Sequence, residues 1–485
     1  MFGRNLDTDR FHTAVFVVAV LVHLITAWKS TGYHSADEHH QIIEFAQYQM
    51  DELPRGHLAW EFPTHIRSSI QPWTAVAVFK GARALGLNDP EHLIFLLRLL
   101  SATLALWSVH RFVRTMQEQV PASLHGALIV LSYFLWFLPF LHVRFSSEGW
   151  SASFLLLGLS ELLRLDRSAR APYLMGLWGT LAMLVRPSSA VVVAGGLAWL
   201  MFVHRPTIGQ WLRMALPALL VAIAGATLDS LFYGTPTFST WNYWIMAITG
   251  PPREAFDTLP WYYYPPWIVK YAIPPVGLLL LAAYVVVLIR KPRHLLIWCM
   301  TPLLLVLSII PHKELRFLYP IADLAPWLLV MGYTEWLGRK WSSRNAAMIV
   351  NTLLVVSLMA NLMGLLVVTT RPAGNGRTAF LRAMKERGNV TYLIDPSMAW
   401  RVEVPPFYRT KIEGDTVIAP SQLQGAFSTA LVIAQETDLK AVSARTGQTF
   451  IPLTRTSPNW EETLLRWYTW NEGWPPWTLY TVQED

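Results

Sequence analysis

The sequence predicts an all-α protein that crosses a membrane many times and ends in a small soluble α/β domain. Of its 485 residues, 53% are hydrophobic and only 15% are charged, which is typical of membrane proteins. Apolar runs of about 18 to 23 residues recur along the chain, and each is long enough to cross a hydrocarbon core of ~30 Å as a helix. After Arg371, charged residues, glycine and proline return, which indicates a change of domain.

The lysine and arginine residues between the apolar runs predict the topology, because such residues concentrate in cytoplasmic loops. The loops assigned to the cytoplasm contain Arg4 and Arg10, Arg111 and Arg114, and residues 164–170, 204–213, 290–294 and 339–344. About eleven spans alternate between these loops, with the N-terminus cytoplasmic and the C-terminus outside. They cover residues 11–28, 91–110, 122–142, 146–163, 171–185, 187–203, 210–232, 273–290, 294–311, 316–335 and 346–368.

Two segments depart from a simple spanning helix. Residues 73–87 look helical, but Lys80 and Arg83 would each cost ~2.5 kcal/mol or more at the bilayer centre. We therefore expect an interfacial helix within one long outer loop, residues 29–90; a true span would instead put the later motifs on opposite faces. Pro187 breaks the helical pattern, and a break at membrane depth is tolerated only where it lines a polar cavity.

Composition also divides the chain into domains and excludes some functions. Residues 1–370 are predicted to form the membrane domain. Residues 371–485 are predicted to form the soluble α/β domain, with a helix at 379–387 and strands at 390–394 and 430–434. The net charge of +7 is spread over short loops, so no nucleic acid is expected as a partner. The single cysteine, Cys299, excludes an intrachain disulfide.

The first outer loop carries two adjacent carboxylates, Asp37 and Glu38, directly after the first apolar run. Such a pair is either a solvated helix cap or a general base whose pKa is raised by desolvation near the lipid. Asp37 and His40 share a helical face, which would permit a metal site. No further ligands stand at suitable spacing, so we expect neither a metal nor another cofactor.

Aromatic residues beside charged ones mark two outer segments. Trp60 and Glu61, followed by Arg67, suit a sugar, whose apolar face stacks on a ring while its hydroxyls need polar partners. Trp60 fits an interfacial aromatic belt equally well. The aromatic segment 260–275 leaves the same two interpretations open, a belt or the lining of an acceptor groove.

A basic cluster, His312, Lys313 and Arg316, stands where a span is predicted to begin on the same side. His312 and Arg316 at i, i+4 would project together from a helix start. Their charge is unfavourable for the helix dipole but fits an anionic lipid phosphate at the headgroup level. A generic lipid contact is the alternative to the specific phosphate site that we favour.

Several strings in their order along the chain resemble glycosyltransferase family 22. Members of this family are dolichyl-phosphate-mannose-dependent mannosyltransferases of the GT-C architecture. The resemblance covers the membrane part and is nearest to the branch that adds the third mannose of the glycosylphosphatidylinositol (GPI) anchor. The strings are "ADEHHQ", "AWEFPTHIRSSIQP", "VRFSSEGW", "LVRPSSA", "LDSLFYGTPTFSTWNYW", "PWYYYPPW" and "PHKELRFLYPI".

The resemblance implies an inverting transfer of mannose from a dolichyl- or other polyprenyl-phosphate donor to a glycolipid or glycan acceptor. The reaction would occur on the non-cytoplasmic face of the endoplasmic reticulum membrane or of a bacterial inner membrane. The base is then Asp37, with Glu38 second, and the residues that hold the donor phosphate are His312, Lys313 and Arg316. The implied substrate-binding residues are Trp60, Glu61, Arg67, Arg144, Glu148, Arg186, Asp229, Tyr233 and Asn242.

A phosphate leaving group needs little protonation, so one base and a cationic cluster suffice, whereas a glycosidase needs two carboxylates. The chain departs from the family pattern at two places. Ser35 and Ala36 stand where the family usually has His-Pro, and Glu148 stands where it usually has Asn. These departures concern the acceptor and the fine geometry more than the reaction class.

Two other classes of protein would also have many membrane spans. A lipid or glycan transporter, such as a flippase, should show internal repeats and charges near the middle of its spans, and the sequence shows neither. A structural subunit of a glycan assembly complex would keep the spans but would not need the acidic pair Asp37 and Glu38.

Overall fold

The computed structural model divides the chain into two compact units. The first comprises Met1–Lys29, Ser35–Asn88 and Leu93–Arg371, and the second comprises Ser30–His34, Asp89–His92 and Pro372–Asp485. Within them the structure describes residues 6–250, 258–337, 344–373, 377–384, 389–396, 402, 404–408, 415–423, 425–427, 431–456 and 477–483.

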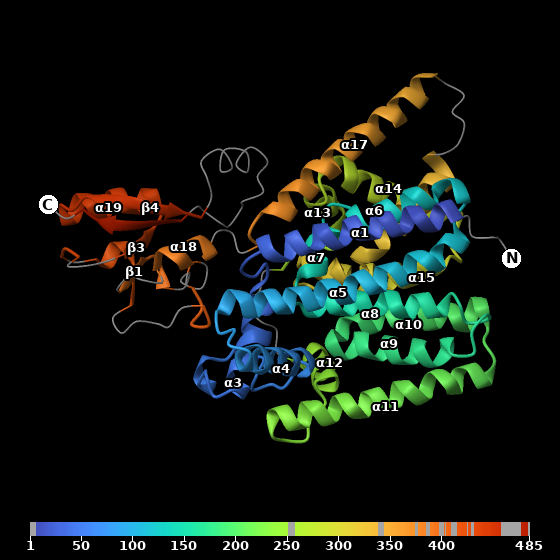
Figure 1. Ribbon diagram of the computed structural model, residues 1–485, viewed down its shortest axis with the longest axis horizontal. Coiled ribbons are helices and arrows are strands. Elements are labelled where there is room, and N and C mark those ends of the chain that lie inside the picture. The colour runs from blue at the N-terminus through green and yellow to red at the C-terminus, as the bar shows by residue number, and fades with distance from the viewer. Residues whose placement is uncertain are drawn as a thin grey trace. The chain divides into compact units, whose positions relative to one another are not determined.

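The first unit is a bundle of helices that run mostly side by side (Figure 1). Its longer helices are α1 (Leu6–Lys29), α5 (Pro90–Met116), α8 (Ser147–Leu162), α9 (Ala171–Val185), α11 (Ile208–Tyr233), α14 (Pro274–Arg290), α15 (Leu295–Ile309) and α17 (Arg344–Thr370). The shorter ones are α6 (His125–Phe134), α7 (Leu138–Val143), α10 (Ala190–Trp199), α12 (Ser239–Thr249), α13 (Tyr264–Tyr271) and α16 (Ala325–Gly332). A 3-10 helix, η7 (Leu315–Leu324), leads into α16, and a π-helical turn, η8 (Tyr333–Leu337), follows it.

Helices occupy all eleven predicted segments, but their lengths do not give eleven spans. In the part of the chain that the structure describes, six helices are long and apolar enough to cross a membrane. A seventh is reached if α14 and α15, bent by 117° at their junction, count as one span. The remaining segments are shorter or broken; residues 135–137, for example, separate α6 from α7.

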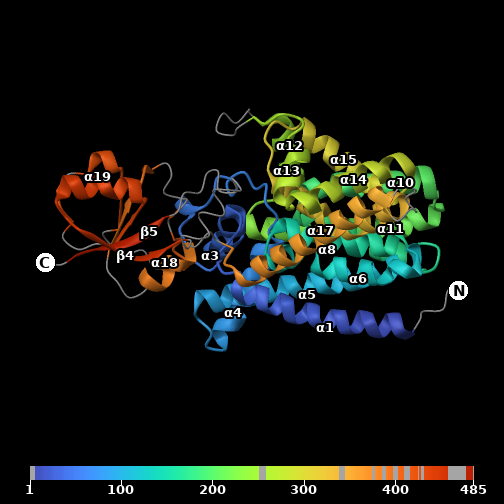
Figure 2. The same ribbon diagram turned by 90° about the horizontal axis from the view of Figure 1, so that it is seen from above.

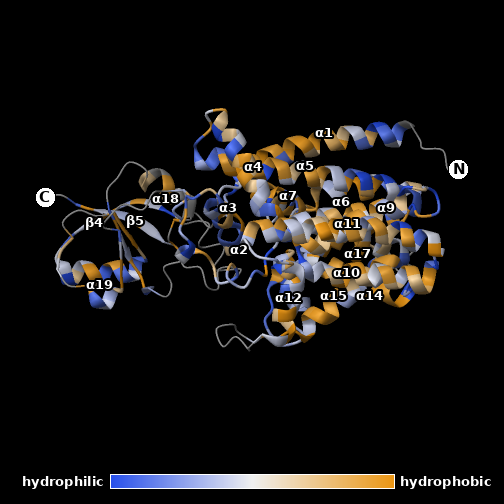
Figure 3. Cartoon of the chain, turned by 90° about the horizontal axis from the view of Figure 1, so that it is seen from below, coloured by the Kyte–Doolittle hydropathy of each residue, from blue (hydrophilic) through white to orange (hydrophobic). Residues whose placement is uncertain are grey.

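The outward faces of the long helices are apolar, as Figure 3 shows for α11 and α17. Large hydrophobic side chains stand exposed there, among them Leu212 and Leu219 of α11 and Leu358 of α17. Exposed apolar surface on this scale suits contact with lipid rather than with water. The protein is therefore a multi-pass membrane protein.

Small residues let neighbouring helices approach closely inside the bundle. A Cβ atom on Gly176 of α9 would lie 2.1 Å from the Met214 carbonyl oxygen of α11. A Cβ atom on Gly195 of α10 would lie 2.0 Å from the Trp298 carbonyl oxygen of α15. Close backbone approach at glycine is a common way to pack helices in membranes, where apolar burial gives little driving force.

Ion pairs connect residues in or next to the loops that were predicted to be cytoplasmic, and these residues lie at one end of the bundle (Figure 1). The pairs are Arg114–Asp9 at 3.4 Å, Arg111–Glu161 at 2.5 Å, His204–Asp166 at 3.2 Å and Lys291–Glu335 at 3.4 Å. Arg4 and most of the predicted loop 339–344 lie outside the described residues. The loop that contains Asp37 and Glu38 and leads into α3 (Glu44–Gln49) and α4 (Ile70–Ala84) lies at the opposite end of the same helices (Figure 1).

The long loop at residues 29–90, which was predicted to lie outside, is largely helical. It contains α2 (Ala36–Glu38), the π-helical turn η1 (His39–Ile43), α3 (Glu44–Gln49), the 3-10 turn η2 (Arg55–His57) and α4 (Ile70–Ala84). The helix expected at 73–87 is α4, which is not among the helices long and apolar enough to span. Phe45 and Phe62 pack with Phe232 of α11, so aromatic burial fixes this loop onto the bundle.

The second unit contains a five-stranded sheet of order β2-β1-β3-β5-β4 (Figure 2). The strands are β1 (Val390–Leu393), β2 (Thr416–Ile418), β3 (Leu431–Ala434), β4 (Phe450–Arg455) and β5 (Thr478–Val482). β1 pairs in parallel with β2 and β3, while β5 is antiparallel to β3 and β4. The unit also contains α18 (Arg377–Met384) and α19 (Glu436–Thr446), and Val442 of α19 packs against Leu393 and Val432 of the sheet.

The predicted strands at 390–394 and 430–434 are confirmed as β1 and β3. The helix expected at 379–387 corresponds to α18, and its last three residues lie outside the described part. The strands β2, β4 and β5 and the helix α19 were not predicted, because these short elements are only partly apolar.

Candidate active site

Four segments meet at one end of the first unit and line a partly open pocket. They are the start of the loop at residues 29–90, the turn before α4, the start of α8 and the break after α9. The lining residues are Asp37, Glu38, Gln41, Ile42, Ile66, Arg67, Ser68, Gln71, Ser146, Ser147, Glu148, Val185 and Pro187. The helix break at Pro187 therefore lines a polar cavity, as its sequence predicted.

The acidic pair opens α2, where Ser35 is the N-cap. The Asp37 backbone N–H donates to the Ser35 hydroxyl at 3.4 Å, and Ser35 has the extended backbone that an N-cap requires. Because Asp37 and Glu38 are adjacent on this short helix, their carboxylates diverge. Glu38 Oε2 lies 3.2 Å from the Arg144 Nε, while Asp37 faces other cations.

Asp37 lies among arginines. Its Oδ2 is 2.6 Å from the Arg316 Nη1 and 3.9 Å from the Arg67 Nη2. Burial alone would raise the pKa of Asp37, but the guanidinium groups of Arg316, Arg67 and Arg186 outweigh it and hold that pKa below its ordinary value. The expectation that desolvation raises the pKa of this carboxyl is therefore wrong, because the neighbouring positive charges dominate.

The i, i+4 spacing of His312 and Arg316 predicted that the basic cluster shares one helical face. The structure shows otherwise. Ile310 is extended before Pro311 and ends α15, and Glu314 is also extended, so η7 begins only at Leu315. The Lys313 ammonium donates to the Ile310 carbonyl oxygen and is buried there. His312 and Arg316 are still brought together, because both contact the carboxylate of Glu314.

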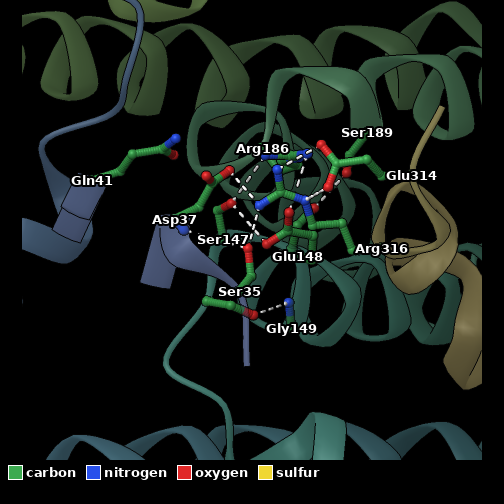
Figure 4. Close-up of polar contacts among 12 residues, drawn as sticks. Ser35, Asp37, Gln41, Ser147, Glu148, Gly149, Arg186, Ser189, Glu314 and Arg316 are labelled. Carbon is green, nitrogen blue, oxygen red and sulfur yellow. Dashed lines mark hydrogen bonds and ion pairs between the residues drawn. The ribbon is translucent and has the colours of Figure 1, made fainter. Parts of the chain in front are cut away.

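A second carboxylate–arginine pair, Glu148 and Arg186, lies beside Asp37 and Arg316 (Figure 4). Glu148 opens α8, whose N-cap Ser146 accepts from the Gly149 backbone N–H at 3.2 Å. Glu148 Oε1 lies 3.1 Å from the Arg186 Nη2, and both side chains are buried. Arg186 also donates to the Ser147 hydroxyl at 3.4 Å.

Glu61 is buried behind Arg67 rather than in the pocket lining. Its Oε1 accepts hydrogen bonds from Gln41 at 3.0 Å and from Arg67 at 3.3 Å. It therefore fixes two side chains that do line the pocket. Trp60 is 41% exposed and is not part of the lining.

Three predicted substrate contacts, Asp229, Tyr233 and Asn242, hold the turn at residues 65–69 instead of lining the pocket. The Tyr233 hydroxyl donates to the Arg67 carbonyl oxygen at 2.7 Å, and the Asn242 side chain donates to the His65 carbonyl oxygen at 3.3 Å. Asp229 Oδ1 accepts from the backbone N–H and hydroxyl of Ser69, at 2.9 and 2.7 Å. These residues support the segment that presents Arg67 and Ser68.

Asp229 also accepts two hydrogen bonds from Ser239 through Oδ2, so it joins α11, α12 and the turn before α4. We expect Asp229→Ala to lower the free energy of unfolding by about 2–4 kcal/mol, because it leaves four buried donors unpaired. Thermal unfolding of the detergent-purified protein measures the effect. Asp166→Ala, which removes a largely exposed partner of His204, should change stability by less than about 0.5 kcal/mol. Equal losses in the two variants would contradict this role.

Sequence reasoning did not single out several polar residues of this region, among them Ser35, Gln41, Ser147 and Glu314. All four lie within or next to strings already recognised. The available signal was alternation: Glu314 stands two residues from both His312 and Arg316, the spacing at which side chains of an extended segment share a side. Among the residues that the structure describes, no group of three His, Cys, Asp or Glu side chains could hold a metal ion.

The chain is similar in sequence to GPI mannosyltransferases. It is 26% identical over 322 residues to GPI mannosyltransferase 3 of Yarrowia lipolytica, a match that covers 64% of this chain and 60% of the relative. It is 25% identical over 361 residues to GPI mannosyltransferase 3 of Drosophila melanogaster, covering 72% of this chain and 60% of the relative. The matches thus span about three fifths of the relatives' length.

Solved structures show the same fold at low identity. ArnT from Cupriavidus metallidurans bound to undecaprenyl phosphate aligns with a TM-score of 0.53 and 10% identity, covering 96% of this chain and 97% of that one. The archaeal oligosaccharyltransferase AglB from Archaeoglobus fulgidus aligns with a TM-score of 0.50 and 12% identity, covering 91% of this chain and 64% of that one. Both matches support a GT-C fold for the chain and carry no information about its substrates.

Residues 14–385 match the family described as the Alg9-like mannosyltransferase family. The matched region contains every residue of the pocket and both arginine–carboxylate pairs. The chain belongs to the Alg9-like mannosyltransferase family.

Proposed function

We propose that the protein is an inverting mannosyltransferase that moves mannose from a polyprenyl-phosphate donor, such as dolichyl-phosphate mannose, to a glycolipid or glycan. The observation that carries this proposal is the contact of Asp37 with Arg316, 2.6 Å apart at the edge of a polar pocket. A base and a phosphate-binding cation are thereby within reach of one sugar. Membership of a mannosyltransferase family supports an enzyme over a transporter or a structural subunit.

The reaction needs one base and one anion site. Asp37 takes the proton of an acceptor hydroxyl as its oxygen attacks the anomeric carbon of the mannose. The bond from that carbon to the phosphate oxygen breaks on the opposite face, and its electron pair stays on the polyprenyl phosphate. Arg316 stabilises this departing charge, so no second carboxylic acid has to protonate the leaving group. The configuration of the sugar is inverted because the attack and the departure occur on opposite faces.

The pocket walls supply the remaining contacts for substrate. Arg67, Glu148 and Arg186 offer donors and acceptors for sugar hydroxyls, and Glu38 with Arg144 forms the floor behind the base. Lys313 is turned toward the Ile310 carbonyl, so its part in phosphate binding is electrostatic unless the segment rearranges. His312 acts through Glu314. Trp60, which is exposed, provides a surface for the acceptor or the lipid headgroups.

We further propose that all eleven helical segments cross the membrane, including the shorter α8 and α9, with the pocket at the outer end. The N-terminus is then cytoplasmic, and residues 371–485 form an outer soluble domain. The gathering of arginine-bearing loops at the other end supports this orientation. The names of the relatives point to a GPI-like glycolipid as the acceptor, in the endoplasmic reticulum membrane or in a bacterial inner membrane.

The proposal predicts transfer in a purified system. The full chain in lipid nanodiscs should transfer labelled mannose from a polyprenyl-phosphate mannose to mannose-terminated glycolipids, and it should not use GDP-mannose directly. Product analysis by mass spectrometry and NMR should find one added mannose of inverted configuration. Transfer from the nucleotide sugar, or retention of configuration, would refute the proposed function.

A further inference from the structure

Glu314 contacts the phosphate-binding arginine at two points. Its Oε2 lies 2.6 Å from the Arg316 Nε, and the Arg316 Nη2 donates to its Oε1 at 2.8 Å. The Glu314 carboxylate thus lies along the Nε–Nη2 edge of the guanidinium group, with a hydrogen bond at Nη2 and an ion-pair contact at Nε. Figure 4 shows Glu314 on one side of Arg316 and Asp37 on the other.

The remaining nitrogen of Arg316 faces the base. Nη1 lies 2.6 Å from Asp37 Oδ2 and also donates to the hydroxyl of Ser35. A guanidinium group carries five N–H donors in a fixed plane, so the group that holds one edge also decides which nitrogen points elsewhere. Glu314 therefore determines that Asp37 meets a single nitrogen of Arg316.

Glu314 is itself fixed from other directions. Its Oε1 is 3.0 Å from the His312 Nε2, and its carbonyl oxygen accepts a hydrogen bond from the Tyr264 hydroxyl at 3.4 Å. Burial alone would raise the pKa of Glu314, but Arg316 and His312 outweigh it and hold that pKa below its ordinary value, so the side chain stays ionised at neutral pH. The clamp on Arg316 is thus charged and held by α13 as well as by its own segment.

An arriving phosphate competes with Asp37 for Arg316. With the Nε edge occupied by Glu314, Asp37 has one strong contact to lose rather than two. If Glu314 were absent, the guanidinium could turn its Nε edge to Asp37 and form a two-point pair, which is the stronger arrangement. The anion would then have to break that pair before it could bind.

We propose that Glu314 is a positioning residue that holds one edge of Arg316, so that Nη1 passes from Asp37 to the donor phosphate when the donor binds. The proposal rests on the proposed function, since it concerns the same lipid-linked donor. Donor binding then has a second effect: it releases Asp37 from its ion pair and leaves the carboxylate available to the acceptor hydroxyl. The base is freed only when a sugar is in place.

The test uses the full-length chain with Glu314→Gln, which keeps the shape but presents an amide N–H₂ to the guanidinium. We expect the KM for polyprenyl-phosphate mannose and the Kd for polyprenyl monophosphate to rise about tenfold, with kcat reduced less than about threefold. Glu314→Asp keeps the charge but shortens the side chain. It should raise KM and Kd by a smaller factor, again with little change in kcat. Glu52→Gln, which removes a carboxylate paired with Arg83 outside the pocket, is the matched control and should change neither constant.

A double-mutant cycle separates positioning from an independent role. In an Arg316→Lys background the added Glu314→Gln change should cost less than about twofold, because lysine has no second edge to clamp. A full tenfold loss in that background, or a Kd for polyprenyl monophosphate equal to wild type in Glu314→Gln, would overturn the inference. Absence of transfer by the wild-type protein would instead overturn the proposed function, and the Kd comparison would then still decide whether Glu314 positions Arg316 for a lipid phosphate.

Discussion

Asp37→Asn is expected to lower kcat for mannose transfer by about 10²–10⁴-fold, the range that loss of a general base costs. The amide keeps the size of the side chain and its place beside Arg316, but it cannot accept the proton of the acceptor hydroxyl. The affinity for polyprenyl monophosphate should not fall, because Asn no longer competes with the phosphate for Arg316. Initial-rate assays together with equilibrium binding of the lipid phosphate measure both effects.

Two comparison variants make this result specific to Asp37. Glu38→Gln should cost roughly tenfold or less, because the Glu38 carboxylate already pairs with Arg144 at 3.2 Å and serves as support. Asp9→Asn, at the far end of the bundle where Asp9 pairs with Arg114, should leave transfer unchanged. If Glu38→Gln proved the more damaging change, the base would have to be reassigned to Glu38.

Much of this site could be predicted from the sequence, because its residues cluster beside apolar runs. The run ending at Trp28 placed Asp37 in a loop directly after the first helix, and the break at Pro187 indicated a polar cavity, which Val185 and Pro187 do line. Apolar runs long enough to cross a bilayer are strong signals for helices, because a segment in lipid must form all its backbone hydrogen bonds internally. The same reasoning could not fix the number of spans, because shorter helices such as α9 do not reach full span length alone.

What the sequence could not supply was the direction of individual side chains. Lys313 and Arg316 stand in one basic string, yet one is buried against the Ile310 carbonyl and the other meets Asp37. The difference arises from the extended backbone around Pro311, which removes the helical spacing on which the expectation rested. Asp229 presents the same problem: its partners, Ser69 and Ser239, come from separate segments that only the fold brings together.

The sign of the Asp37 pKa shift also depends on tertiary structure. A carboxyl near lipid is expected to have a raised pKa when desolvation acts alone. Here Arg316, Arg67 and Arg186 come from three different segments and together reverse that shift. No local pattern around Asp37 contains them. A base of lowered pKa stays ionised at neutral pH, and the release of Arg316 to the donor phosphate would restore part of its basicity.

Arg316→Gln is expected to lower kcat/KM by about 10²–10³-fold, the cost of losing one charge-stabilising donor at the developing anion. Donor binding and the chemical step are both affected, because the same guanidinium binds the donor phosphate and stabilises its departure. Arg316→Lys should recover part of the loss through its charge but not the two-edged geometry. Arg114→Gln, which removes an arginine from the opposite end of the bundle, is the matched control and should retain activity.

The pH profile gives Arg316→Gln a second readout. Arg316 is the strongest of the cations that depress the pKa of Asp37, and Arg67 and Arg186 also face the carboxyl, while Glu314 opposes them. A base is active above its pKa and inactive below it, so a depressed pKa puts the acid limb of kcat/KM in the wild type below the ordinary aspartate value of about 3.9. Removing Arg316 leaves Asp37 and Glu314 as neighbouring like charges, which raises the pKa of each and moves the limb to higher pH. An acid limb that stays in place while activity collapses would mean that Arg316 acts on the phosphate alone and that Asp37 is not the titrating base.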